Sequence, residues 1–321
     1  MGLFGLLVIV RTVLYIAVPA ITLPRRYIHA ADLFASVFFV ALPIVALYAG
    51  ANFGWNWKRS LSATAAGFGI QAAFSLLSSH AHSALLGNTL FSVSQAGLII
   101  WCLGLGAFIA TILKDSNLLL PLSVFLALFD FWLVFCPEGP VGQIARQSGK
   151  TVLPSIAYRV PTMVHAPPGA PIQALAYVGP ADFMFLAMFF VALYRFKMRT
   201  RATFIAIIPV LVLYMLAVLL LGNVTIGPVS LAAMPALLPI GIVVLATNWR
   251  EFHLTKDERV STAVLTVAGL ALVSWRMSLH WHDSELPVGP SNQAPAQSAP
   301  ALPESHGSGA PGRSSAPLLR V

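Results

Sequence analysis

The chain has 321 residues, of which 58% are hydrophobic and only 9% charged, and its mean hydropathy is +0.81. A soluble domain carries about 25% charged and 45–50% apolar residues, because a core surrounded by water needs polar cover. This composition excludes a soluble globular enzyme and indicates a protein that uses lipid as its solvent. The net charge of +8 fits loops that face anionic lipid. No basic stripe interleaved with aromatic residues is present, so we expect no nucleic-acid partner.

Nine apolar runs reach or approach the roughly 20 residues that a helix needs to cross a bilayer. In chain order they cover residues 3–23, 32–52, 62–79, 90–113, 117–136, 173–195, 202–222, 227–247 and 260–280. They are too long and too uniformly apolar for barrel strands, so they predict an all-α fold, a polytopic bundle of about nine transmembrane helices. The first run holds Arg11, which is costly at mid-depth unless it reaches the interface or pairs.

The runs divide the chain into three parts. Residues 1–113 are N-terminal transmembrane helices, and residues 114–282 form a candidate catalytic core. The core contains a long polar connection, residues 137–172, with a strand-like piece around Ile156–Val164. Residues 283–321 are rich in Pro, Ser, Ala and Gly, and this tail is predicted to be disordered because it cannot bury enough apolar surface.

Lys and Arg concentrate in every second connection between the predicted helices. The connections after the second, fourth, sixth and eighth runs hold Lys58, Arg59, Lys114, Arg195, Lys197, Arg199, Arg201, Arg250, Lys256 and Arg259. Those of the other parity hold Arg25, Arg26, Arg146, Lys150 and Arg159. Because positively charged loops stay in the cytoplasm, we expect a cytoplasmic N-terminus, with residues 137–172 and the tail outside.

Two acidic residues, Asp130 and Asp182, lie inside apolar runs, whereas Asp32 and Asp115 are predicted at helix ends and the other acids in loops or the tail. A carboxylate at membrane depth costs several kcal/mol, so it indicates a functional site by default. The alternative is a protonated Asp that joins two helices by a hydrogen bond. Two such residues, with no buried Lys or Arg expected beside them, favour the functional interpretation.

The surroundings of the two acids differ. Gly179 and Pro180 precede Asp182, so a helix that runs from residue 173 is expected to break there and begin again, with Asp182 in the first turn of the new helix. Asp130 has no such breaker. Different surroundings can push two carboxyl pKa values apart, which lets one acid act as a base and the other as an acid on a shared water.

A third element is the sequence LAAMPALLPIGIVV. Here Pro235 and Pro239 are expected to bend one span and free backbone carbonyls, and Ala236 allows another backbone to approach. Alone, this pattern is that of an ordinary proline kink.

Together, the three elements resemble the presenilin and signal peptide peptidase family of intramembrane aspartyl proteases. That family has an aromatic–Asp pair, then Gly-x-Gly-Asp, then Pro-Ala-Leu. Here Phe129-Asp130, Gly179-Pro180-Ala181-Asp182 and Pro235-Ala236-Leu237 stand in those places, at spacings of 52 and 53 residues between positions 130, 182 and 235. The resemblance covers about residues 117–247 and is that of a divergent, prokaryotic member.

The chain also departs from the family pattern. Phe129 replaces the usual Tyr and removes a hydroxyl near the acid, and Ala181 replaces the second Gly. The two Asp-bearing runs are the fifth and sixth of this chain and the Pro-Ala-Leu run is the eighth, whereas the family has them sixth, seventh and ninth.

The resemblance implies a presenilin-like fold and hydrolysis of peptide bonds within the bilayer. Asp130 and Asp182 would be the catalytic pair, and a second group would shape the site or bind substrate: Phe129, Gly179, Pro180, Ala181, Pro235, Ala236 and Leu237. The substrates implied are transmembrane segments such as remnant signal peptides, paired as an extended strand with the segment that ends near Tyr177. The implied location is a bacterial or archaeal cell membrane.

Two other functions stay open at this stage: a proton-coupled transporter that uses the buried Asp pair, and an inactive family member that only binds membrane segments. No cofactor and no metal are expected. The pairs His80/His82 and His280/His282 lack the third ligand that a metal site needs, and Cys102 and Cys136 cannot form a zinc site. The oligomeric state is not fixed by the sequence.

Overall fold

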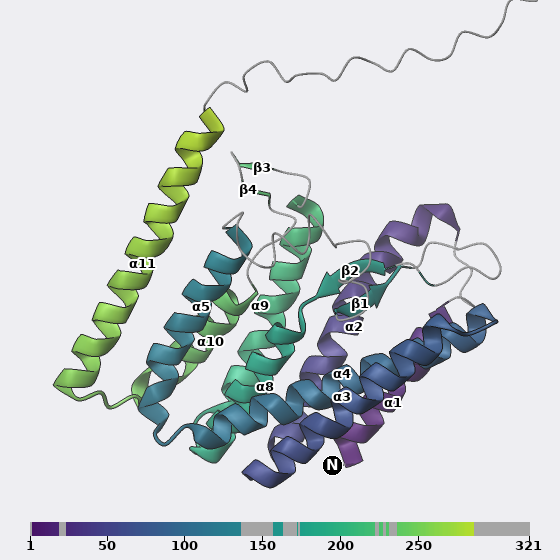
Figure 1. Cartoon of the computed structure of the whole chain (residues 1–321), viewed down its shortest axis with the longest axis horizontal. Helices are drawn as coiled ribbons and strands as arrows, with labels where there is room; N and C mark the ends of the chain where they lie inside the picture. The colour runs from purple at the N-terminus through teal and green to yellow at the C-terminus, as the bar shows by residue number, and fades with distance from the viewer. Residues whose placement is uncertain are drawn as a thin grey trace, which may run out of the picture.

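The computed structural model describes residues 2–18, 24–135, 157–162, 172, 174–221, 225–226, 229–230 and 236–285, and helices account for 84% of these residues. Among these residues the α-helices lie side by side, with α3 and α4 inclined to the steeper α5, α8, α9 and α11 (Figure 1). They are α1 (Gly2–Ala17), α2 (Arg25–Ala51), α3 (Trp57–Ser79), α4 (Ala84–Ile112), α5 (Leu119–Phe135), α8 (Pro180–Arg195), α9 (Thr200–Leu221), α10 (Leu237–Asn248) and α11 (Lys256–Glu285). The prediction of a helical bundle is thereby confirmed for the described residues, which also include four short strands.

Four of these helices are long and apolar enough to cross a membrane, over Arg26–Ala51, Trp57–Ser79, Ala84–Ile112 and Thr200–Val218. Large apolar side chains also face outward, among them Leu6, Ile9, Phe68, Leu76 and Leu213, each more than half exposed. Water would penalise so much apolar surface, whereas lipid does not. Length and exposure together indicate a membrane protein.

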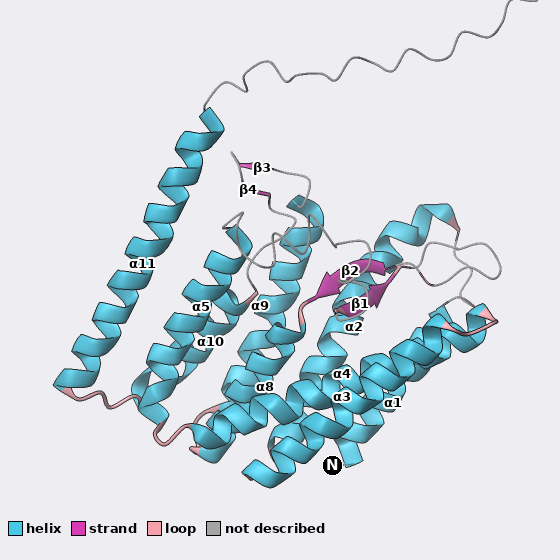
Figure 2. Cartoon of the chain, viewed as in Figure 1, coloured by secondary structure: helices cyan, strands magenta, loops and turns pink. Residues whose placement is uncertain are grey.

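Two of the predicted spans are shorter than the sequence suggests. Residues 173–195 do not form a broken helix, because Ala174–Val178 is a strand, β2, and α8 begins only at Pro180. In the run 227–247, α10 begins at Leu237, after the short strands β3 (Thr225–Ile226) and β4 (Val229–Ser230) (Figure 2). Short apolar runs are compatible with both helix and strand, so periodicity alone could not separate them.

The prediction of a proline kink in this last span is wrong. Pro239 is the third residue of α10, where the backbone N–H of a helix has no intrahelical partner in any case, so proline begins this helix rather than bending it. Pro235 lies outside the described residues. The tail does too, apart from residues 283–285, which continue α11.

Helix α4 occupies the centre of the bundle and packs against α3, α8 and α1. Glycines permit the close approaches. A Cβ atom added to Gly97 would lie 2.6 Å from the backbone N of Gln71 in α3, and one added to Gly106 would lie 2.7 Å from the backbone N of Met188 in α8. Small residues of this kind let helices meet backbone to backbone in lipid, where the hydrophobic effect does not drive association. Helix α4 therefore fixes the position of α8.

Candidate active site

Three helices far apart in the sequence meet around Asp130 and Asp182. Helix α10 packs against α5, which carries Asp130, and also against α9 and α8, the second of which carries Asp182. Figure 1 shows α5, α10, α9 and α8 as neighbours on one side of the bundle. Helix α10 thus joins the two acid-bearing helices.

The carboxylate of Asp130 is buried and accepts a hydrogen bond from the third sequence element. The backbone N–H of Leu237 donates to Asp130 Oδ2 at 2.8 Å. Leu237 is the first residue of α10, and an N–H at that position has no partner within its own helix. The helix dipole adds positive potential at the same point. The start of α10 therefore supplies the polar partner that a carboxylate at this depth needs.

Asp182 lies in the first turn of α8, as the Gly-Pro sequence predicts. Gly179 is the N-cap and Pro180 the first helical residue, and the Asp182 N–H donates to Gly179 O at 3.2 Å. The thiol of Cys102 in α4 donates to Pro180 O at 3.3 Å. A Cβ atom at Gly179 would lie 3.4 Å from Asp182 Oδ2, in contact with the carboxylate. Glycine at this position leaves that side of the carboxylate uncovered.

The two acids are close enough to interact. The charge of Asp130 acts on Asp182, and the charges of both act on Tyr214 of α9. The Tyr214 hydroxyl is buried and has no hydrogen-bond partner among the described residues. Sequence analysis missed this residue, although a lone hydroxyl inside the apolar run of α9 was a usable signal.

The remaining predicted site residues divide into two groups. Ala236 is the N-cap of α10 and precedes the Leu237 N–H that binds Asp130. Phe129 is 39% exposed and its ring stacks on Phe125 at 5.7 Å between centroids, so it belongs to the outer face of α5. Ala181 is also exposed.

A two-stranded antiparallel sheet leads directly into α8. Strand β1 (Tyr158–Pro161) pairs with β2, with Tyr158 opposite Val178 and Val160 opposite Ala176 (Figure 2). The strand-like piece predicted around residues 156–164 is thus present. On the far side of β1, Gln95 of α4 accepts from the N–H of Arg159 at 2.9 Å and donates to the carbonyl of Ala157 at 3.2 Å.

Three buried polar contacts fix the same hairpin to α1 and α2. Arg11 is only 1% exposed, and its Nε donates to the Tyr158 hydroxyl at 3.1 Å, while that hydroxyl donates to Phe39 O at 2.8 Å. Thr162 donates to Asp32 Oδ1 at 3.0 Å. The expectation that Asp32 is an acid at a helix end is wrong, because it is buried within α2. Burial raises the pKa of Tyr158, which keeps its hydroxyl protonated.

The pairing pattern leaves one edge of this sheet without a partner among the described residues. Residues 157 and 159 direct their backbone groups to Gln95, so residues 158 and 160 direct theirs to β2. Alternation along β2 then directs the backbone groups of Leu175 and Tyr177 away from β1. This edge precedes Asp182 by only a few residues.

Among the described residues, no three His, Cys, Asp or Glu side chains lie close enough together to hold a metal ion. The ring of His80 hydrogen-bonds to Leu76 O at the end of α3. No family model, no curated protein and no solved structure matches this chain.

Proposed function

We propose that this chain is an intramembrane aspartyl protease with a presenilin-like core, which hydrolyses peptide bonds of transmembrane segments such as remnant signal peptides. The observation that carries the proposal is the convergence of Asp130, Asp182 and the Leu237 N–H, three groups from separate elements. Among the described contacts, no buried Lys or Arg pairs with either acid. Two interacting carboxylates without a cation are most stable when they share one proton.

The chemistry follows from that shared proton. The ionised carboxylate takes a proton from a water molecule, whose oxygen attacks the carbonyl carbon of the substrate. The protonated carboxyl donates its proton to the carbonyl oxygen, which gives a tetrahedral diol. As the C–N bond breaks, the proton taken from water passes to the amine, and one diol hydroxyl returns its proton to the other carboxylate, which restores the carbonyl and the shared proton. No covalent enzyme intermediate is needed.

The free edge of β2 supports the same function. A transmembrane helix shields its own amides, so it must unwind before it can be cut, and unwound backbone in lipid needs hydrogen-bond partners. The outward-facing backbone of Leu175 and Tyr177 can provide them by strand addition. A substrate strand on this edge would run toward the start of α8, where Asp182 lies.

The test is cleavage of a labelled signal-peptide-like helix by the purified protein in detergent. Asp130→Asn and Asp182→Asn keep the side-chain shape, and each is expected to slow cutting by about a thousandfold or more. Asp115→Asn is the matched control, because Asp115 caps a short 3-10 helix (Ser116–Leu118) at the far end of α5. This variant should cut the substrate at the normal rate. Normal cutting by either of the first two variants would refute the proposal.

A further inference from the structure

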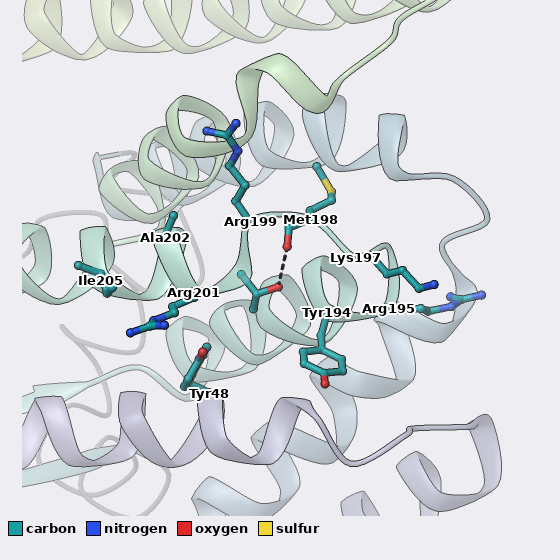
Figure 3. A pocket seen from close by; sticks show the side chains of 10 residues that line it. Tyr48, Tyr194, Arg195, Lys197, Met198, Arg199, Arg201, Ala202 and Ile205 are labelled. Atoms are coloured by element: carbon teal, nitrogen blue, oxygen red, sulfur yellow. Dashed lines mark hydrogen bonds between the residues drawn. The ribbon is translucent and has the colours of Figure 1, made fainter.

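A second polar site lies at the other end of α8, far along that helix from Asp182. A cavity of about 930 Å³ opens there between α2 and the connection from α8 to α9. Figure 3 shows its lining, with Tyr48 and Tyr194 on one side and the basic residues around the rest. The connection from α8 to α9, which lines this cavity, lies at the end of the bundle where α1 begins (Figure 1).

Four cations line this cavity, and they fall into two pairs. Arg195 donates to the last carbonyls of α4, including Ala110 O at 2.7 Å, and Arg199 forms an ion pair with Glu251 at 3.1 Å. The side chains of Lys197 and Arg201 form no hydrogen bond or ion pair with any residue that the structure describes. Lys197 is also held at a φ of 56°. The cavity thus contains two positive charges without a counter-charge.

An apolar seam continues from the cavity along the same two helices. It is lined by Val37, Val40, Ala41 and Ile44 of α2 and by Ile208, Leu211, Val212 and Met215 of α9. Tyr48 and Ile205, one turn nearer the basic end, belong to the cavity. The seam encloses only about 10 Å³, so an apolar chain would lie along its mouth rather than inside it.

We infer that this cavity binds the phosphate headgroup of an anionic phospholipid, whose acyl chain lies along the seam between α2 and α9. Charge selects an anionic headgroup, because the side chains of Lys197 and Arg201, which extend to opposite sides of the cavity in Figure 3, place an uncompensated positive charge on each side of it. The seam distinguishes a lipid from a free phosphate, since only a lipid has an apolar chain to place there. Exposed Trp57 and Trp249 mark the same end of the bundle as a membrane interface, the depth at which a headgroup is found.

The inference does not depend on protease activity, so it is tested by binding. Full-length protein in detergent is mixed with equal amounts of phosphatidylglycerol and phosphatidylcholine, and the bound lipid is counted by native mass spectrometry. The double variant Lys197→Gln/Arg201→Gln is expected to retain about tenfold less phosphatidylglycerol than the wild type. Both side chains are exposed, so the fold should survive, and an unchanged melting temperature checks this.

The matched control is Lys58→Gln/Arg250→Gln, which removes one Lys and one Arg from the same end of the bundle but outside the cavity. It should retain phosphatidylglycerol as the wild type does. An equal loss in both double variants would mean a general surface-charge effect and would overturn the site. Displacement of the lipid by glycerol 3-phosphate at equal concentration would overturn the assignment of a lipid as the ligand and assign the cavity to a soluble phosphate. Equal retention of phosphatidylcholine and phosphatidylglycerol by the wild type would overturn charge selection.

Discussion

At the scale of single residues, Tyr214 has the most unusual environment. Its hydroxyl is buried without a partner among the described residues, and it interacts electrostatically with both Asp130 and Asp182. A buried hydroxyl without a partner lowers the stability of the fold. Under the proposed function, this hydroxyl can donate to the reacting oxygen and so take the place of the hydroxyl that Phe129 lacks.

Removal of the Tyr214 hydroxyl is therefore expected to lower the activity without lowering the stability. Tyr214→Phe should lower kcat by about a hundredfold, the usual loss when one donor to a developing charge is removed. The melting temperature should stay the same or rise, because the variant buries one polar group fewer. Tyr27→Phe, exposed near the start of α2 and outside both proposed sites, should change neither quantity. A fall in stability together with activity would assign Tyr214 a structural role instead.

Tyr158, by contrast, carries a hydroxyl that we expect to stabilise the fold. Its hydroxyl accepts from Arg11 and donates to Phe39 O, so its removal leaves two buried groups without a partner. We expect Tyr158→Phe to lower the free energy of unfolding by about 1–3 kcal/mol, measured by thermal unfolding in detergent. Tyr177→Phe, on the exposed side of the paired strand, should change it little. Equal effects of the two substitutions would contradict the anchoring role of Tyr158.

At the scale of elements, the hairpin is built so that only one edge is free. Gln95 covers the outer edge of β1, and β1 covers the inner edge of β2, so the backbone of Leu175 and Tyr177 faces outward and has no partner among the described residues. An uncovered edge next to Asp182 is the natural place for an unwound substrate to pair.

Removal of one backbone donor tests this edge. Leu175→Pro deletes the outward N–H, and it should reduce cutting by about fivefold to tenfold, the net effect of one hydrogen bond. Leu175→Ala shortens the side chain but keeps the N–H, so it separates the two contributions. The comparison is made by kcat/KM on the same labelled helix. If Ala reduces cutting as much as Pro, the side chain and not the backbone is what the substrate needs.

Part of these elements could be predicted and part could not. The length of the apolar runs indicates the helices, and Gly179-Pro180 indicates the start of α8. The start of α10 was less predictable, because two prolines in one apolar run are compatible with a kink as well as with a helix start. The burial of Arg11 depends on Tyr158 and Ser92, which are 147 and 81 residues away, and no local pattern encodes such contacts.

At the scale of the whole molecule, positive charge and aromatic residues gather at one end. Lys114, Lys197 and Arg250 lie at the end where α1 begins, and His82 lies at the connection at the opposite end (Figure 1). The rule that positive loops remain in the cytoplasm then predicts that the N-terminus is cytoplasmic.

Single cysteines report this orientation. In a background without the two native cysteines, Lys114→Cys should react with a membrane-impermeant maleimide only after cells are opened. His82→Cys should react in intact cells. The reverse pattern would place the N-terminus outside, and labelling of both in intact cells would mean that the helices between them do not separate two compartments.

The shortness of α8 has a consequence for what a protease of this shape would release. Thirteen residues separate Asp182 from Arg195 at the basic end of the helix, a rise of about 20 Å. The hydrocarbon layer is about 30 Å thick, so under the proposed function the reacting bond would lie past the midplane, on the side away from the basic end. The bundle would then set the length of the substrate segment that stays in the membrane. A substrate would keep a stub of about thirteen helical residues embedded from the cytoplasmic surface, too short to span the bilayer and therefore free to leave it.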